Sequence, residues 1–269
     1  MNLSQFTQNG KYLMLALDHR ESFRKLLNPK NPSFVTEDAI IQMKSEIINS
    51  LYDQLSGILI DTEFGLPAYQ GKSKPYLLPI EKSGYKDLNG DRLTELEFTA
   101  TQLKEMGASG VKLLIYFNHD SSTVNAQMET VKKVLSDCKN NNLPLFLEIV
   151  TYNEKGTKSK QIITAVSMFL DQGIRPDVFK LEYPENEHSC DILTNYLGGT
   201  PWILLTRGID YEAFKKQLET AASHGASGFL AGRSLWQEAA RIEKQERRIF
   251  LKSVVVERFK EICIIIEGA

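Results

Sequence analysis

Short apolar segments alternate with longer amphipathic segments along almost the whole chain. This alternation predicts repeated strand–helix units, with buried strands in a parallel sheet and helices covering it. Eight segments are predicted as strands: 12–18, 57–62, 76–82, 110–117, 144–151, 177–183, 202–207 and 227–232. The clearest predicted helices between them are 37–55, 93–106, 122–140, 158–172 and 211–224.

The number of strands predicts the fold class. Eight strands with intervening helices fit one circuit of a (β/α)8 barrel, which typically has about 250 residues, and this chain has 269. We therefore predict a single-domain TIM barrel of the α/β class over residues 1–269, with a helical tail at about 241–269. The alternative is a doubly wound open sheet, which favours a glycine-rich loop after the first strand. The first strand is followed instead by DHRESF, which contains no glycine.

Composition limits the partners and the cellular compartment. The chain has 32 Lys and Arg against 34 Asp and Glu, a net charge of −2. Proteins that bind nucleic acid or anionic membranes have a basic excess, so we expect neither partner. The start of the sequence lacks a signal-peptide pattern, and no apolar run is long enough to cross a bilayer. With three isolated cysteines, predicted to be reduced thiols, the chain reads as a cytoplasmic protein.

Charged residues stand inside four otherwise apolar strands. Because side chains alternate along a strand, Asp18 shares a face with Met14 and Ala16, opposite the large leucines. By the same rule, the other three charges lie opposite the aliphatic side chains of their strands: Lys112, Glu148 and Lys180. If the aliphatic faces pack under helices, the four charges point into the barrel, where burial requires that they be paired.

Two lysines beside a carboxylate suit carbonyl chemistry. A desolvated lysine beside another cation has a lowered pKa and supplies a neutral amine. That amine forms a Schiff base with a ketone, and the iminium withdraws electrons from the adjacent C–C bond, while a carboxylate transfers protons. This chemistry, that of a class I aldolase, needs no metal and no cofactor. A metal-dependent aldolase needs clustered histidines, and the chain has no HxH or HxxxH pair among His19, His119, His188 and His224.

Glycine and arginine follow the last two predicted strands, at Gly208, Gly232 and Arg233. The loops after these strands often bind phosphate in barrels, through backbone N–H groups. Glycine permits close approach of the backbone, and arginine donates two hydrogen bonds. The alternative is that the glycines only form tight turns. The arginine, placed just before a short predicted helix at 235–240, favours a phosphate site.

Eight segments taken together, in this order, resemble the LacD-type class I aldolase family: LALDHR, DTEFGLP, IEKSGY, VKLLIYF, FLEIVTY, DVFKLEYP, PWILLTRG and GASGFLAGRSLW. They extend over about residues 12–240. The family includes tagatose 1,6-bisphosphate aldolase and sulfofructosephosphate aldolase. The resemblance implies a TIM barrel that cleaves a ketose phosphate into dihydroxyacetone phosphate and an aldehyde.

The resemblance also implies roles for single residues. Lys180 would be the Schiff-base lysine, with Glu148 and Lys112 as acid/base and positioning residues. Asp18 matches the aspartate that contacts substrate hydroxyls. The complete expected substrate-binding set, including the region for the phosphate of dihydroxyacetone phosphate, is Asp18, His19, Arg207, Gly208, Gly232 and Arg233.

The chain departs from the family at two of these positions. Some members have glutamine where this chain has His19, and the seventh-strand motif often reads LSAG where residues 205–208 are LTRG. The extra cation at Arg207 would strengthen binding of an anion, or would point away and pair with a carboxylate. The chain is also shorter than the longer tagatose-bisphosphate members. These differences do not change the predicted chemistry, but they leave the identity of the substrate undecided.

Several alternatives follow for function and for two further features. Tagatose or fructose 1,6-bisphosphate is the first candidate substrate, sulfofructose phosphate the second, and a deoxy-keto-sugar-acid phosphate the third. A non-catalytic regulatory protein that senses sugar phosphates is the alternative of another class, although binding alone does not require a buried nucleophilic lysine. Glu81 lines the pocket or only pairs with a cation such as Lys82. The apolar tail 259–269 packs on the barrel as a last helix or forms a contact in a homo-oligomer.

Overall fold

The centre of the computed structural model, which describes residues 2–153 and 155–269, is a closed barrel of eight parallel strands. The strands are β1 (Tyr12–Leu17), β2 (Gly57–Ile60), β3 (Tyr76–Pro79), β6 (Gly110–Phe117), β7 (Leu145–Thr151), β8 (Val178–Leu181), β9 (Trp202–Leu205) and β10 (Gly228–Ala231). Each strand pairs with the next one in this order, and β10 closes the barrel on β1. The predicted TIM barrel is therefore confirmed, and the open sheet is wrong.

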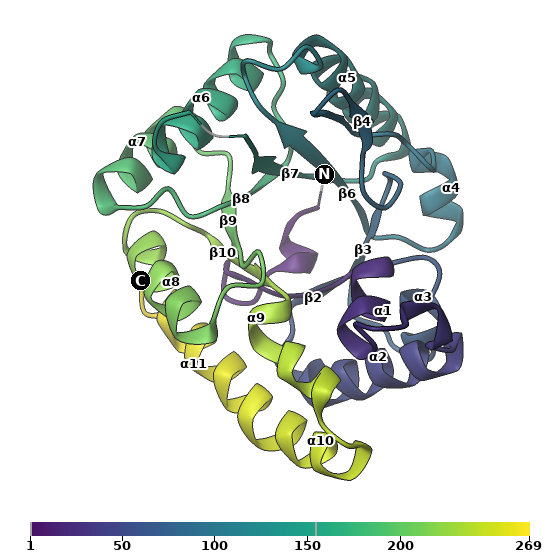
Figure 1. Ribbon diagram of the computed structural model, residues 1–269. Helices are drawn as coiled ribbons and strands as arrows, with labels where there is room; N and C mark the ends of the chain where they lie inside the picture. The colour runs from purple at the N-terminus through teal and green to yellow at the C-terminus, as the bar shows by residue number, and fades with distance from the viewer. Residues whose placement is uncertain (1, 154) are drawn as a thin grey trace.

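Helices form the outer ring of the barrel (Figure 1). They are α1 (Glu21–Leu27), α2 (Glu37–Leu51), α3 (Gly65–Ala68), α4 (Ala100–Glu105), α5 (Val124–Asn141), α6 (Lys158–Asp171), α7 (Glu187–Leu197), α8 (Tyr211–Ser223), α9 (Arg233–Trp236), α10 (Lys244–Phe250) and α11 (Val256–Glu267). Side chains cap the first turns of several helices by accepting hydrogen bonds from otherwise unpaired N–H groups. These caps are Thr36, Thr99, Thr157, Asn186 and Asp210.

Alternation along the strands separates two buried layers. The outward layer packs under the helices and includes Leu13 and Leu15 of β1. The inward layer fills the barrel and includes Met14 of the same strand, with Phe146 of β7. A 3-10 helix, Ser4–Phe6, brings the ring of Phe6 to 5.3 Å from that of Phe146, and this contact closes the N-terminal end of the barrel. Polar side chains on the inward faces are left to gather at the opposite, C-terminal end.

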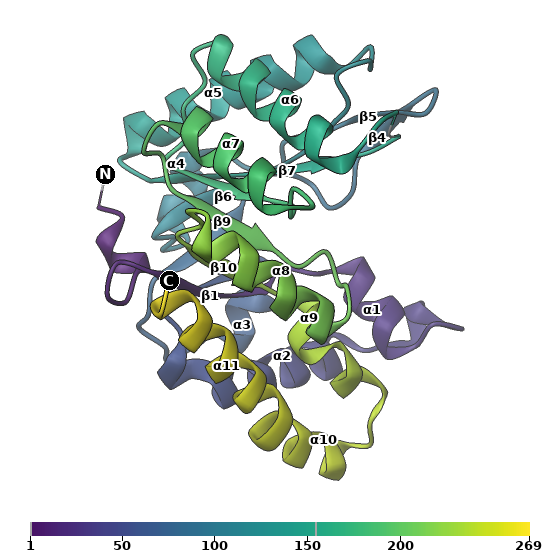
Figure 2. The same cartoon turned by 90° about the vertical axis from the view of Figure 1, so that its left-hand side faces the viewer.

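The segment between β3 and β6 differs from the predicted helix at 93–106. An antiparallel hairpin forms first, from β4 (Lys86–Leu88) and β5 (Asp91–Leu93), and the helix begins only at Ala100. The reason is local: Thr99 and Gln102 form a capping box that fixes the first turn of α4. Figure 2 shows the hairpin at the end of the barrel opposite the N-terminus.

Tyrosine rings hold the hairpin against the barrel. The guanidinium of Arg92 lies 4.5 Å, 5.3 Å and 4.6 Å from the ring centroids of Tyr85, Tyr116 and Tyr152. The hydroxyl of Tyr152 also accepts a 2.8 Å hydrogen bond from the backbone N–H of Arg92. The hairpin thereby lies beside the C-terminal ends of β6 and β7.

The C-terminal segment is helical and lies against the barrel. A π-helical turn, Leu251–Val255, joins α10 to α11, and α11 packs beside α8 (Figure 2). Phe259, Ile262 and Ile266 are fully buried, while Ile264 on the other face is exposed. The apolar tail is thus a last helix packed on the barrel. Among the described residues, no helix is both long and apolar enough to cross a membrane.

Near the last strand, the short helix predicted at 235–240 begins earlier and changes type. The structure has α9 from Arg233 to Trp236, followed by a 3-10 helix from Gln237 to Arg241. The chain therefore enters a helical turn directly after Gly232.

Candidate active site

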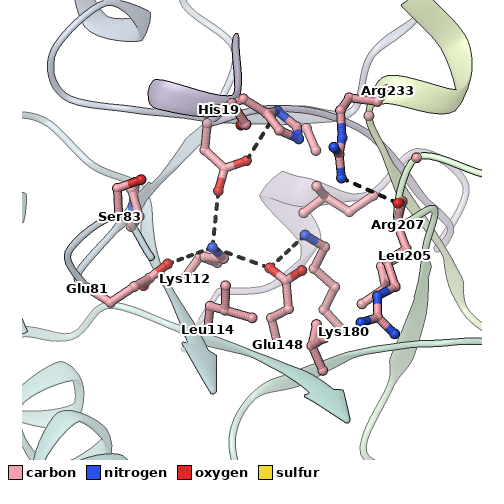
Figure 3. Close-up of a pocket in the computed structure, with 18 of the residues that line it drawn as sticks. His19, Glu81, Ser83, Lys112, Leu114, Glu148, Lys180, Leu205, Arg207 and Arg233 are labelled. Atoms are coloured by element: carbon pink, nitrogen blue, oxygen red, sulfur yellow. Dashed lines mark hydrogen bonds and ion pairs between the residues drawn. The ribbon is translucent and has the colours of Figure 1, made fainter. Parts of the chain in front are cut away.

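A cavity of about 340 Å³ opens at the C-terminal ends of the barrel strands. Figure 3 shows ionisable side chains from several strands converging on its floor. Every residue of the predicted site lies in its lining: Asp18, His19, Lys112, Glu148, Lys180, Arg207, Gly208, Gly232 and Arg233. The described residues contain no group of three or more His, Cys, Asp or Glu side chains suited to hold a metal ion.

The ammonium of Lys112 is the centre of the cluster. Its Nζ lies 2.6 Å from Glu81 Oε1, 3.1 Å from Asp18 Oδ2 and 3.3 Å from Glu148 Oε2, and the side chain is only 4% exposed. Burial alone lowers the pKa of Lys112, but the three carboxylates outweigh it and raise this pKa well above its usual value. Lys112 therefore stays a cation, which leaves Lys180 as the lysine expected to supply the neutral amine.

Glu148 connects the two lysines. Glu148 and Lys180 are direct neighbours in the register of β7 and β8, and Lys180 Nζ donates a 2.8 Å hydrogen bond to Glu148 Oε2. Burial raises the pKa of Glu148, but Lys180 and Lys112 more than compensate, so the net pKa is lowered. The pKa of Asp18 is likewise lowered, since the attraction of Lys112 exceeds the effect of burial. Both carboxyl groups are ionised at neutral pH.

Glu81 is a third carboxylate of this cluster, and the sequence left its role open. It pairs with Lys112, whereas Lys82 is exposed and lies 3.9 Å from Glu95. Burial is the larger influence on Glu81 and raises its pKa despite the nearby ammonium. One sequence signal was available: Glu81 has the same parity as Leu77, which faces the barrel interior.

His19 is held neutral beside this cluster. Burial lowers the pKa of His19 to about 4, although Asp18 attracts its protonated form from 4.0 Å. The ring packs edge-on against Trp236, with centroids 5.6 Å apart. Its Nδ1 is buried and has no hydrogen-bond partner among the described residues.

The lowered pKa of His19 predicts a dependence of stability on pH. Between about pH 6.5 and 4 the unfolded chain binds a proton at His19 and the folded chain does not, so the free energy of unfolding falls as pH decreases. The contribution is complete above pH 6.5 and amounts to about 1 kcal/mol per pH unit inside the window. Urea unfolding of wild type and His19→Gln at several pH values measures it. Parallel pH profiles for the two proteins would contradict the assignment.

Glycines bring the last two loops together at the other side of the cavity. Gly208 has φ +76°, and a Cβ there would lie 3.0 Å from Arg233 Cζ, so the guanidinium packs against this backbone. A Cβ at Gly232 would lie 3.2 Å from the Ala16 carbonyl oxygen and 3.3 Å from His19 Cε1. Gly208 thus combines a left-handed φ with a close contact to Arg233, and Gly232 leaves little room beside Ala16 and His19.

Arg207 shows the second of the two orientations expected from the sequence. Its guanidinium forms an ion pair with Glu182, and its backbone carbonyl accepts a 3.3 Å hydrogen bond from Arg233 Nη2. Arg233 Nε is buried and has no hydrogen-bond partner in the part of the chain that the structure describes.

A buried ion pair behind the site was not predicted from the sequence. Lys44 of α2 is fully buried and donates to the carbonyl oxygens of Leu17 (2.9 Å) and His19 (2.8 Å), and it also pairs with Asp61. Asp61 in turn accepts a 2.7 Å hydrogen bond from the backbone N–H of Phe64. This pair fixes the backbone on both sides of Asp18. No sequence pattern distinguishes Lys44, because a lysine in an amphipathic helix is ordinarily solvated.

Comparisons with known proteins identify the family. The model of the DeoC/LacD family aldolases matches residues 12–238. The chain belongs to this family. It is 30% identical to the tagatose 1,6-diphosphate aldolase of Staphylococcus haemolyticus (strain JCSC1435), over 87% of this chain and 83% of that protein. It is also 30% identical to tagatose 1,6-diphosphate aldolase 1 of Streptococcus mutans serotype c, over 89% and 85% of the two chains.

Solved structures agree on the fold of this DeoC/LacD aldolase. A crystal structure of an archaeal fructose 1,6-bisphosphate aldolase superposes with a TM-score of 0.71 at 18% identity, covering 99% of this chain and 98% of that one. A Schiff-base-forming fructose-1,6-bisphosphate aldolase superposes with a TM-score of 0.67 at 20% identity, covering 94% and 96%. The resemblance to the LacD-type family is confirmed by the family match and the relatives. The protein is an aldolase, a carbon–carbon lyase.

Proposed function

We propose that this aldolase cleaves a phosphorylated ketose reversibly through a Schiff base on Lys180. The observation that carries the proposal is the 2.8 Å hydrogen bond from Lys180 Nζ to Glu148, at the floor of the cavity. A nucleophile within hydrogen-bond reach of a base is the arrangement that covalent catalysis requires. The permanently charged Lys112 on the other side of Glu148 keeps this carboxylate ionised and in place.

The first half of the reaction forms the iminium. Glu148 accepts a proton from the Lys180 ammonium, and the neutral amine attacks the ketone carbon of the substrate. The carbinolamine hydroxyl then takes a proton and leaves as water, which gives the protonated Schiff base. Glu148 is positioned for both transfers because it contacts the nitrogen that bonds to the substrate.

The second half breaks the bond between C3 and C4. A carboxylate removes the proton of the C4 hydroxyl, the C3–C4 electron pair moves into the iminium, and an aldehyde leaves. Protonation of the enamine at C3, followed by hydrolysis of the iminium, releases dihydroxyacetone phosphate and regenerates Lys180. Glu148 serves as the proton carrier in this proposal, and Asp18 contacts the substrate hydroxyls from the end of β1.

The charges around the cavity support a phosphate at Arg233. Among the described residues of the lining, the other lysines and arginines have carboxylate partners within 4.0 Å; these are Arg20, Lys82, Lys112, Lys180 and Arg207. Arg233 has no such partner, and its Nε is buried and unbonded. With the Gly208 backbone against it, this arginine completes a site for the phosphate next to the reacting ketone.

The names of the relatives favour tagatose 1,6-bisphosphate, with fructose 1,6-bisphosphate as its epimer, as the substrate. Sulfofructose phosphate has the same phosphate end and differs at the aldehyde end. A deoxy-keto-sugar-acid phosphate has a carboxylate next to its ketone and carries its phosphate at the aldehyde end. Comparing kcat/KM across the four compounds ranks them. We further propose that the enzyme works in the cytoplasm on this small substrate, without nucleic acid or membrane, and that homo-oligomerisation is compatible with the exposed face of α11.

Borohydride trapping tests the Schiff base. Treating the enzyme with dihydroxyacetone phosphate and sodium borohydride is expected to inactivate it and to attach the reduced triose phosphate to Lys180, as seen by peptide mass mapping. Lys180→Arg is the matched control and should take up no label. Labelling of another lysine, absence of an adduct in the active wild-type enzyme, or inhibition by EDTA would refute the proposal.

A further inference from the structure

We propose that Arg207 is a positioning residue: its backbone carbonyl orients Arg233, and its ion pair with Glu182 holds Arg207 in place. Arg207 is not itself a ligand of the substrate. The inference rests on the proposed function, in which Arg233 binds the phosphate. Arg207 is also one of the two positions at which residues 205–208, LTRG, differ from the LSAG pattern.

The backbone at Arg207 is the first observation. Arg207 has φ +53°, in the left-handed region that residues other than glycine seldom adopt, and Gly208 follows with φ +76°. Two consecutive positive φ values turn the chain so that the Arg207 carbonyl oxygen faces Arg233. Figure 3 shows this carbonyl joined to the Arg233 guanidinium, while the Arg207 side chain extends away from it.

The ion pair with Glu182 is the second observation. Its carboxylate is only 6% exposed and already accepts hydrogen bonds from the Thr151 backbone N–H (2.8 Å) and hydroxyl (3.1 Å), with Lys158 Nζ at 3.2 Å. The Arg207 guanidinium pairs with the same carboxylate. The Glu182 carboxylate is therefore held by contacts to β7 and α6. Its ion pair with Arg207 stabilises the left-handed backbone of that residue.

The consequence is a fixed guanidinium at Arg233. Arg233 Nη2 donates to the Arg207 carbonyl oxygen at 3.3 Å, and the guanidinium packs against Gly208, where a Cβ would lie 3.0 Å from its Cζ. These two contacts orient the arginine before a phosphate arrives, and its buried Nε has no hydrogen-bond partner among the described residues. Such preorganisation increases affinity because less conformational freedom is lost on binding.

A ligand role for Arg207 would require a different movement. Its side chain would have to leave Glu182 and swing towards Arg233, and the buried carboxylate would lose one of its two cations. Removing a partner from a buried carboxylate is costly. The two roles also predict opposite changes in phosphate affinity when Glu182 is neutralised. If Arg207 were a ligand, loss of the ion pair would free its guanidinium and strengthen binding. If Arg207 positions Arg233, the same loss would weaken binding.

Binding of inorganic phosphate to the full-length protein distinguishes the two roles without an activity assay. Isothermal titration calorimetry is expected to give a dissociation constant about tenfold higher for Glu182→Gln and for Arg207→Met than for wild type. The double variant should be no weaker than either single one, since both changes break the same pair. Arg207→Lys, which keeps a cation beside Glu182, should recover most of the affinity. In substrate kinetics the loss should appear mainly in KM.

Two controls assign the effect. Arg233→Met should abolish phosphate binding, and Lys82→Met removes a charge from the same cavity wall without touching the pair, so it should have little effect. Tighter or unchanged phosphate binding in Glu182→Gln, or an equal loss in Lys82→Met, would overturn the proposal. If Arg207→Met does not fold, Glu182→Gln and Arg207→Lys decide the question. Borohydride labelling of Lys180 in wild type reports separately on the proposed function.

Discussion

Replacing Lys180 by methionine is expected to lower kcat by about 10⁵-fold or more, because the amine that forms the covalent intermediate is removed and Glu148 has no nucleophile to deprotonate. Methionine preserves the volume of the aliphatic stem in the barrel interior, so the fold should remain. Steady-state rates of ketose cleavage, measured by coupled detection of dihydroxyacetone phosphate, give the loss. Circular dichroism and thermal unfolding check that the variant is folded.

Two control variants test whether the loss of activity is specific to the amine of Lys180. Lys132→Met alters a lysine on α5 that is 39% exposed and contacts Glu129 and Gln172 at the protein surface, so it should leave kcat unchanged. Arginine in place of Lys180 keeps the positive charge beside Glu148 but stays protonated, so it should be as inactive as methionine. A folded Lys180→Met protein with more than about one hundredth of wild-type activity would exclude a Schiff base at this residue.

Replacing Lys44 by methionine is expected to lower the free energy of unfolding by about 3–5 kcal/mol, because Asp61 would remain buried without its counter-ion. Both side chains are completely inaccessible to solvent. The carbonyl oxygens of Leu17 and His19 would also lose their donor. Urea unfolding followed by circular dichroism measures the change.

Two further variants distinguish the effect of an unpaired buried charge from that of a packing defect. Lys44→Met combined with Asp61→Leu removes both charges and should recover part of the lost stability. Lys260→Met breaks an exposed pair with Glu257, in which both side chains are more than half exposed, and should cost less than about 1 kcal/mol. A loss in Lys44→Met no larger than that in Lys260→Met would show that the buried pair does not stabilise the fold.

The barrel was predictable because its signal is repeated and local. Each strand has an apolar outward face, and side-chain alternation assigns the opposite face without knowledge of the neighbours, as Met14 beside Leu13 and Leu15 illustrates. The segment 93–106 was harder, because its apolar pattern was read without the capping box at Thr99 that starts α4. The hairpin before it consists of two strands of three residues, too short for periodicity to reveal.

The sequence identified which residues lie in the candidate site, but it did not predict their protonation states. A charge inside an apolar strand is visible in the sequence, and this alone selected Asp18, Lys112, Glu148 and Lys180. Their mutual distances decide the protonation. Lys112 stays charged because three carboxylates surround it, and the third is Glu81, a residue just after β3 whose role the sequence left open.

By itself, the sequence determined the barrel, the inward direction of the four strand charges and the family, because these depend on local periodicity and on motif order. Only the tertiary structure decided which charges pair. Lys44 is joined to Asp61 and Arg207 to Glu182 across 17 and 25 residues of chain. The energy of an ion pair depends on distance and burial in three dimensions, and neither quantity is written in the local pattern of a strand or a helix.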